Sequence, residues 1–383
     1  MAQAQAQAQS ANPQTIPFSI GSAFTSRAAF SLPPQSLTSG ILMPTGYPQS
    51  IPSFGWLANL VFTFTVSFAA TATTAFGPDG IDAVIDRIGV RTAGGSPLVE
   101  PLSGFEWHMV NKFFGTRFGA GTRPAGTDPD QLPGTNLTIT PSAQNTLTFT
   151  RALQFELDAN TALGSIPATA SNREFTIDLS LGALTTLFPV GTPAGVTVSA
   201  TATAWFWDLP ADNAVPFGVD QSGQTLRLIS RESAPVNAGS AQNVQSVQRG
   251  NIFANHMLIF RDSNNIRQSA SFPQQLDMLI DNNVRLHMMQ NEWMNNMASW
   301  FGLSLNGQAL DTPGGLNTGV FVIPWRLLAG GAGNGADNSH AQMLATLNTS
   351  QIQFNGISFG VNGNLTIIGD QISTPNAAYV YSK

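Results

Sequence analysis

Histidine is the residue type best suited to bind a metal or transfer a proton, and the chain has four: His108, His256, His287 and His340. Metal sites place histidines at short, regular spacings such as H-E-x-x-H, and no two of these lie at such a spacing. The sequence places His108 and His256 on predicted strands and His287 at the start of a predicted helix. We therefore expect structural roles and no metal or cofactor.

Carboxylate pairs are the second arrangement that could act chemically, as the acid and base of glycan hydrolysis. Asp128 and Asp130 lie in a loop rich in Pro and Gly, and Asp79, Asp82 and Asp86 surround a turn and the strand after it. No twelve-residue calcium-loop pattern accompanies them. We interpret Asp128 and Asp130 as turn residues, and calcium at the Asp79-Gly80 turn stays an alternative. Because acids scattered along a chain form chance pairs often, the sequence predicts no catalytic residue.

The remaining motifs also favour a protein without enzymatic activity. The chain has no Cys, which excludes disulfides, thiolate metal sites and thiol catalysis. The glycine-rich loop 330–335 lacks the Lys-Ser/Thr ending of a phosphate-binding loop, and no G-x-S-x-G sequence occurs. Trp205 and Trp207 lie on the Thr/Ser side of a predicted strand. Rings there could stack on a sugar or pack against a neighbouring sandwich or subunit, and we favour packing because no acidic or amide cluster is adjacent in sequence.

Charge is scarce along the whole chain. The 383 residues include 16 Lys/Arg and 22 Asp/Glu, so 10% are charged, against about 25% in an ordinary soluble domain. Such a surface suits a protein that packs against copies of itself. The net charge of −6 and the scattered arginines argue against a sequence-specific nucleic-acid-binding surface.

The elements that would position these residues are mostly strands. Alternating apolar residues over 60–69 give one aromatic face. Further strands are expected at 84–90, 105–110, 147–157, 175–181, 196–208, 226–230, 252–260, 276–280 and 319–328. Three short segments follow at 352–354, 357–361 and 365–367, with hairpin turns or bulges at Asn355-Gly356 and Asn362-Gly363. A stripe that includes Trp293 and Met297 predicts a helix near 284–301, capped by 281–283.

These elements predict an all-β fold of two consecutive jelly-roll β-sandwiches, a double jelly roll with few short helices. A break rich in Pro, Asp, Asn and Gly at 209–223 separates the halves. The expected organisation is an N-terminal arm at 1–52, a first jelly roll at 53–215 and a second at 216–383. The first ten residues lack the features of a signal peptide, and the run 56–70 is too short and too polar for a membrane-spanning helix.

Several short stretches resemble the major capsid proteins of tectiviruses. They are the turn Phe76-Gly77-Pro78, the strand 84–88, the stretch Ser103 to Asn111, the strand ending Leu258 to Asp262, the Trp-bearing helix near 290–300 and the Gly-Val-Phe strand at 319–321. The resemblance covers about two-thirds of the chain in layout, and only short pieces in residues.

The resemblance implies a major capsid protein without enzymatic activity, made in the host cytoplasm and located in the virion. Homotrimers with a pseudo-hexagonal outline would tile an icosahedral shell. Expected partners are neighbouring capsid trimers, other virion proteins such as a vertex protein, and an internal lipid membrane reached by the N-terminal arm. Two alternatives are a glycan-binding or glycan-cleaving β-sandwich protein, and a minor vertex or spike protein.

Overall fold

A computed structural model describes residues 24–37, 48–51, 54–92, 95–114, 139–156, 164–168, 175–208, 226–239, 241–268, 272–301, 318–328, 343–346, 348–356 and 358–373. Several features singled out in the sequence lie outside these ranges: the loop 330–335, Asp128, Asp130, His340 and the break at 209–223.

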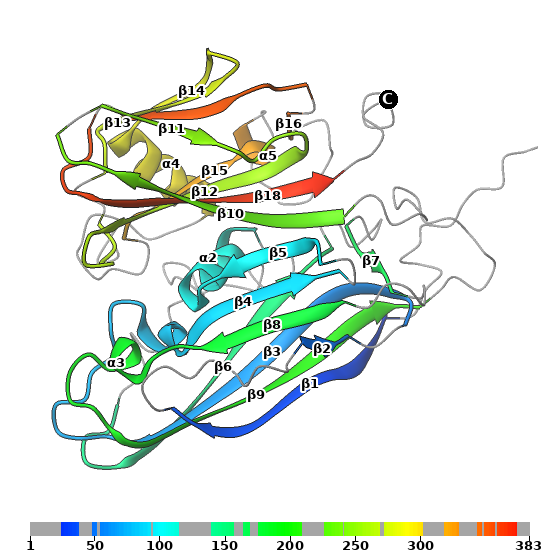
Figure 1. Cartoon of the computed structure of the whole chain (residues 1–383), viewed down its shortest axis with the longest axis vertical. Helices are drawn as coiled ribbons and strands as arrows, with labels where there is room; N and C mark the ends of the chain where they lie inside the picture. Colours follow the sequence, from blue (N-terminus) through cyan, green and yellow to red (C-terminus); the bar gives the residue numbers. More distant parts are fainter. Residues whose placement is uncertain are drawn as a thin grey trace, which may run out of the picture.

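The first sandwich is built from two four-stranded sheets with a shared apolar core (Figure 1). One sheet has the order β1-β9-β3-β6, and the other has the order β2-β8-β4-β5. The strands are β1 (Phe24–Ser36), β2 (Pro48–Ser50), β3 (Trp56–Ala69), β4 (Ile85–Arg91), β5 (Pro97–Leu102), β6 (Gln144–Gln154), β8 (Thr176–Leu181) and β9 (Ala194–Trp207), and the short β7 (Ile166–Pro167) pairs with β3.

The second sandwich repeats this plan with sheets β10-β18-β12-β15 and β11-β17-β13-β14. Its strands are β10 (Leu226–Val236), β11 (Gln242–Ser246), β12 (Ile252–Asp262), β13 (Gln275–Ile280), β14 (Asn283–Met289), β15 (Val320–Pro324), β17 (Ile352–Gly356) and β18 (Gly363–Ser373), and the short β16 (Leu344–Ala345) pairs with β12.

Both sandwiches have the same topology. With the two-residue strands β7 and β16 set aside, numbering the strands of each sandwich one to eight gives sheet orders 1-8-3-6 and 2-7-4-5 in both. This is the jelly-roll order, which confirms the predicted all-β double jelly roll. The sandwiches join where β5 and β10 lie side by side in parallel, with Val99 opposite Ile229, so that one sheet runs through both (Figure 1).

Helices are short, and one of them corrects the sequence analysis. Residues 105–110 were expected to form a strand, but they belong to the helix α2 (Gly104–Phe114). The Ser103 hydroxyl accepts a hydrogen bond from the Glu106 N–H at 3.3 Å, and the Glu106 carboxylate accepts one from the Ser103 N–H at 2.8 Å. This reciprocal capping box starts the helix, and it outweighs the alternation of apolar residues.

Replacing Ser103 with Ala is expected to lower the free energy of unfolding by about 1 kcal/mol, because the substitution removes one half of the capping box. Urea unfolding would measure the change. The matched control is Ser67→Ala at a half-buried strand position, where the lost partner is another hydroxyl, that of Thr146 at 3.1 Å. Equal effects in the two variants would contradict a capping role for Ser103.

The predicted helix at 284–301 is correct only in its second part. Residues 283–289 form β14, and the helix α4 spans Gln290–Phe301. Asp281 and Asn282, expected as helix caps, have φ angles of 49° and 65° and make the two-residue turn between β13 and β14. Left-handed conformations at both positions are what a tight hairpin requires, and Asp and Asn tolerate them.

Two smaller predictions were also wrong. The predicted strand 319–328 ends at Pro324, and the short helix α5 (Trp325–Leu328) follows it. Asn355 and Gly356 do not form a turn. They belong to β17, where they pair with both β11 and β13.

Part of the predicted N-terminal arm is a strand of the first sandwich. β1 pairs along β9 from Phe24 to Ser36. Pro33 and Pro34 fall where the register shifts between Leu32 and Gln35. Proline has no N–H to donate, and an edge strand with an irregular pairing tolerates it. No helix among the described residues is long and apolar enough to cross a membrane.

Candidate assembly surface and the junction between the sandwiches

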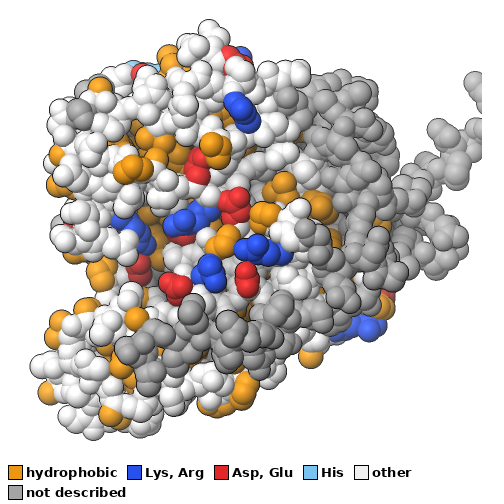
Figure 2. Space-filling model, viewed as in Figure 1, with side chains coloured by type: hydrophobic (Ala, Val, Ile, Leu, Met, Phe, Trp, Pro, Cys, Tyr) orange, Lys and Arg blue, Asp and Glu red, His pale blue; other side chains and the backbone are white. Residues whose placement is uncertain are grey.

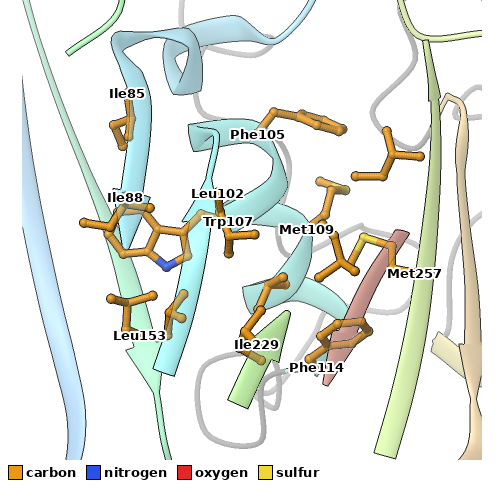
Figure 3. Close-up of a cluster of buried hydrophobic side chains, with 14 of the residues drawn as sticks. Ile85, Ile88, Leu102, Phe105, Trp107, Met109, Phe114, Leu153, Ile229 and Met257 are labelled. Carbon is orange, nitrogen blue, oxygen red and sulfur yellow. The ribbon is translucent and has the colours of Figure 1, made fainter. Parts of the chain in front are cut away.

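Helix α2 lies between the two sandwiches and buries residues on both sides (Figure 3). Trp107 points into the first sandwich beside Ile88 and Leu153, and its indole N–H donates to the Ala152 carbonyl at 2.7 Å. Met109 and Phe114 point toward Ile229 of β10 and Met257 of β12 in the second sandwich (Figure 3). The junction therefore has an apolar centre built around one helix.

Ion pairs bind the sandwiches together at one end of this centre. Asp79, in the turn before the 3-10 helix η1 (Gly80–Val84), accepts hydrogen bonds from Arg261 at 2.9 Å and Arg267 at 3.0 Å. Both arginines belong to the second sandwich and lie over the ring of Phe105 in α2. Arg267 also donates to the carbonyls of Pro78 and Thr318. One carboxylate of the first sandwich therefore holds two largely buried cations of the second.

A second buried ion pair lies within the second sandwich, and its arginine on β10 reaches across the junction. The Arg227 guanidinium donates two hydrogen bonds to Asp370 of β18, at 2.7 and 2.9 Å. It also donates to the carbonyls of Gln154 and Phe114 in the first sandwich, at 2.7 and 3.0 Å. Asp370 accepts another hydrogen bond from Asn255. Because Arg227 and Asp370 are 2% and 0% exposed, each charge depends on the other for compensation.

Two further sets of charged residues lie in the first sandwich, and one of them forms an ion pair across the junction. Arg231 of β10 pairs with Glu106 of α2 at 2.8 Å, so the capping-box carboxylate also contacts the second sandwich. Inside the first sandwich, Asp82 accepts from Arg151 at 2.6 and 3.0 Å, and its other oxygen lies 3.2 Å from His108.

Charged side chains are unevenly distributed on the face of the molecule that Figure 2 shows. Lys/Arg and Asp/Glu side chains gather across the middle of the visible face, over the region where β4, β5 and β10 lie (Figures 1 and 2). Large parts of the two sandwiches on either side of it show few charges (Figure 2). The scarce charges of this face are thus concentrated near the junction.

The outer side of sheet β1-β9-β3-β6 carries hydroxyls in place of charges. We call it the hydroxyl face, and it consists of Thr63, Thr65, Ser67, Thr146, Thr148, Thr150, Thr197, Ser199, Thr201 and Thr203 on β3, β6 and β9. Neighbouring hydroxyls bond across the strands, as between Thr65 and Thr148 at 3.3 Å. No outward residue of these three strands is charged. A face of this kind loses little solvation energy when another protein covers it, since no charge has to leave water.

The structure separates the histidines. His108 is buried beside Asp82, and burial followed by the nearby Arg151 charge lowers its pKa. His256 is buried on β12 and accepts a hydrogen bond from the Trp325 indole N–H at 2.8 Å. His287 is exposed on β14, 2.7 Å from Asp277. The described residues hold no group of three His, Cys, Asp or Glu that could bind a metal.

His256 predicts a pH dependence of stability. Burial lowers its pKa to about 3, whereas an unfolded chain has about 6.5. The unfolded state therefore binds the extra proton between these values, so stability is full above about pH 6.5 and falls as the pH drops toward 3. From pH 6.5 to pH 5 the loss is about 2 kcal/mol. His256→Gln keeps an acceptor for Trp325 and should flatten this part of a urea-unfolding pH profile. An unchanged profile would contradict the assignment.

The acidic residues around the turn go to different partners. Asp79 binds Arg261 and Arg267, Asp82 binds Arg151, and Asp86 accepts from Ser180 at 3.0 Å. Nothing in this arrangement leaves two of these carboxylates facing a shared space. The sequence placed Asp79 and Asp82 around a turn and the strand after it but did not reveal their partners, because Arg261 lies 182 residues from Asp79 and Arg151 lies 69 residues from Asp82.

The two tryptophans form an aromatic cluster at one end of sheet β1-β9-β3-β6. Trp205 stacks on Phe24 of β1, with ring centroids 5.3 Å apart. Trp207 is buried next to Trp56 and donates its indole N–H to Glu156. Glu156 is the acidic neighbour that the sequence did not reveal. Glu156 and Trp207 are both buried and bonded to one another, so neither presents its polar atoms to solvent.

Comparison with known proteins places the fold. No protein-family model and no curated protein matches the sequence. The structure matches solved viral major capsid proteins, and the chain has their double jelly-roll fold.

One match is the major capsid protein of Sulfolobus turreted icosahedral virus, with a TM-score of 0.60 and 13% identity over 94% of this chain and 100% of that one. The PBCV-1 virus capsid gives 0.57 and 9% over 92% and 94%. The major capsid protein of bacteriophage PM2 gives 0.51 and 10% over 93% and 99%.

Proposed function

We propose that this chain is a viral major capsid protein and that it acts by assembly, without catalysis. The observation that carries the proposal is the double jelly-roll fold, which matches viral coat proteins over more than nine-tenths of the chain. The charge-poor hydroxyl face supports it, because a shell protein must bury large sides against its neighbours. Its location would be the capsid of the virion.

The proposed assembly unit is a homotrimer with a pseudo-hexagonal outline. Two sandwiches of the same topology in each chain give six similar units in three chains, which suits a lattice position with six neighbours. The ion pairs at the junction support this arrangement, since they hold the two sandwiches in one orientation. Neighbouring trimers, a vertex protein and an internal membrane reached by the N-terminal arm are the further partners that we propose.

The domain limits remain a proposal as well. The first jelly roll would end at 215, since β9 ends at Trp207 and β10 begins at Leu226. The arm would need a shorter definition than 1–52, because Phe24–Ser36 forms β1. A truncation that tests the arm should therefore stop before Phe24, so that the first sheet stays complete.

Native mass and imaging would test the proposal. Light scattering of the purified chain should give three times its 40.5 kDa, and negative-stain images should show six-cornered particles. In purified virions the chain should be the most abundant protein. A monomer that stays soluble at high concentration would overturn the proposal, and a few copies per virion would point to a minor vertex or spike protein.

A further inference from the structure

Helix α2 takes part in a buried cluster of ionisable side chains inside the first sandwich. His108 of α2 lies 3.2 Å from one carboxylate oxygen of Asp82, and Arg151 of β6 donates two hydrogen bonds to the other oxygen. Lys112 stands one turn after His108 on the same helix. We call these four residues the His108 cluster. Their exposed fractions run from 0% at Asp82 to 8% at Lys112, so water screens their charges poorly.

The two sandwiches can be compared at this place because each has a buried tryptophan that marks it. Trp107 and Trp293 are both the fourth residue of the helix that follows the fifth strand of their sandwich. Each indole N–H donates to a carbonyl of the sixth strand, that of Ala152 at 2.7 Å and that of Val322 at 2.8 Å. The helix is therefore seated in the same way in both sandwiches.

The second sandwich has apolar residues where the first has the His108 cluster. The corresponding positions are the residue after the tryptophan, the residue before the carbonyl that accepts from it, and the residue three places before the fourth strand. They hold His108 and Met294, Arg151 and Phe321, and Asp82 and Phe272. Phe272 and Phe321 stack with ring centroids 3.8 Å apart, where the first sandwich has an ion pair.

This difference shows that the fold does not require ionisable groups at this place. Apolar side chains fill it in the second sandwich, and well-packed apolar residues are often as stable as a buried ion pair, or more stable. A chain with few charges nevertheless places four ionisable residues here. The His108 cluster therefore adds a response to pH that the apolar counterpart lacks.

A single carboxylate has to compensate every positive charge of the cluster. The charged groups that act on His108 are Asp82 of η1, Arg151 of β6 and Lys112 of its own helix. Burial, and then the Arg151 charge, lower the pKa of His108, and together with Lys112 they outweigh Asp82, which raises it. Asp82 also favours the charged form of Arg267. Its negative charge is thus already engaged before His108 takes up a proton.

We propose that His108 is an acid-sensitive release for helix α2: a proton bound to its ring adds a third positive charge beside one carboxylate and loosens the helix. Helix α2 holds the second sandwich through Met109 and Phe114 and through the ion pair of Glu106 with Arg231 (Figure 3). Loosening α2 therefore weakens the contact between the two sandwiches. That acid in this way opens an assembled shell rests on the proposed function.

The direction of the response follows from proton linkage. A histidine in a released helix is solvated and has a pKa of about 6.5. The pKa of His108 in the packed helix is lower, so the released state binds more protons below about pH 6.5. Release therefore becomes more favourable as the pH falls, by up to about tenfold between pH 6.5 and pH 5.

Hydrogen exchange of the purified full chain tests the release without requiring a shell. The protection of the α2 amides, corrected for the intrinsic exchange rate at each pH, should fall by up to about tenfold from pH 6.5 to pH 5. His108→Met copies the second sandwich, and His108→Gln keeps a polar side chain that does not titrate. In both variants the protection of α2 should stay constant over this range. His256→Gln is the matched control, because it removes another buried histidine and should leave the loss in α2 unchanged.

Two results would overturn the inference. One is constant α2 protection in the unmodified chain, and the other is an equal loss of protection in the unmodified chain and in the two His108 variants. Neither result bears on assembly, so the capsid proposal would stand. Conversely, light scattering that shows a monomer would overturn the proposed homotrimer and leave the release of α2 in place.

Discussion

Replacing Asp79 with Asn is expected to lower the free energy of unfolding by about 3 kcal/mol, the lower end of the cost of removing one partner from a buried ion pair, because the Asp79 side chain is itself 20% exposed. Asp79 compensates Arg261 and Arg267 together. Burial lowers the pKa of Arg267, which means that burial disfavours its charged form, and Asp79 is the largest influence that opposes it. Without the carboxylate, two guanidinium groups over the same Phe105 ring would face one another.

Urea unfolding of the purified protein would measure this loss. Asp178→Asn is the matched control: its carboxylate pairs with Arg91 at 3.4 Å, but the two side chains are 40% and 45% exposed. An exposed pair contributes about 0–1 kcal/mol, so the control should change stability little. If Asp79→Asn lowered the free energy of unfolding as little as Asp178→Asn, the ion pairs of Asp79 would contribute no more to stability than an exposed ion pair.

Replacing Arg227 with Met is expected to have an effect of similar size, about 3–5 kcal/mol. The variant leaves the Asp370 carboxylate buried with Asn255 as a remaining donor, and it strips the Gln154 and Phe114 carbonyls of their partner. Lysine would not rescue the site, because one ammonium cannot reproduce the planar fork that bonds Asp370 and both carbonyls.

A double-mutant cycle separates the pair from its surroundings. Asp370→Asn should also destabilise the protein strongly, whereas Arg227→Met combined with Asp370→Asn should cost less than the sum of the two single changes by more than about 1 kcal/mol. Arg91→Met, at the exposed pair, serves as the control. Additive effects at Arg227 and Asp370 would contradict their direct compensation.

These variants also address assembly. The ion pairs at the junction would fix the orientation of the two sandwiches. If they do, a folded Asp79→Asn or Arg227→Met variant should form irregular particles even where its subunits still associate. Stability and assembly therefore report on the junction in different ways.

The sequence by itself determined much of the strand content and the class of fold. Alternation along 60–69 predicted β3, because the side-chain period of a strand is two and one of its faces is buried. It also determined that the chain has no Cys and that no two histidines lie at metal-ligand spacing. Charge scarcity indicated a surface meant for contact, though not which surface.

Local signals in the sequence were also present where the prediction was wrong. Ser103 and Glu106 stand at capping-box spacing, and that pattern would have identified α2. Asp281-Asn282 fits a two-residue hairpin turn as well as it fits a helix cap. In both cases two local patterns competed, and hydrogen bonding decided between them.

Only the tertiary structure decided which charges meet. Asp79 lies 182 residues from Arg261, and Arg227 lies 143 residues from Asp370, so no local pattern connects them. Pairing of β10 with β18 brings Arg227 to Asp370, and packing of the two sandwiches brings Asp79 to Arg261. Low exposure then makes each charge depend on its partner. The tertiary structure likewise showed that β12 is covered on both sides and β3 on one, because burial on the outer face depends on a neighbouring sandwich and is not encoded in the period of a single strand.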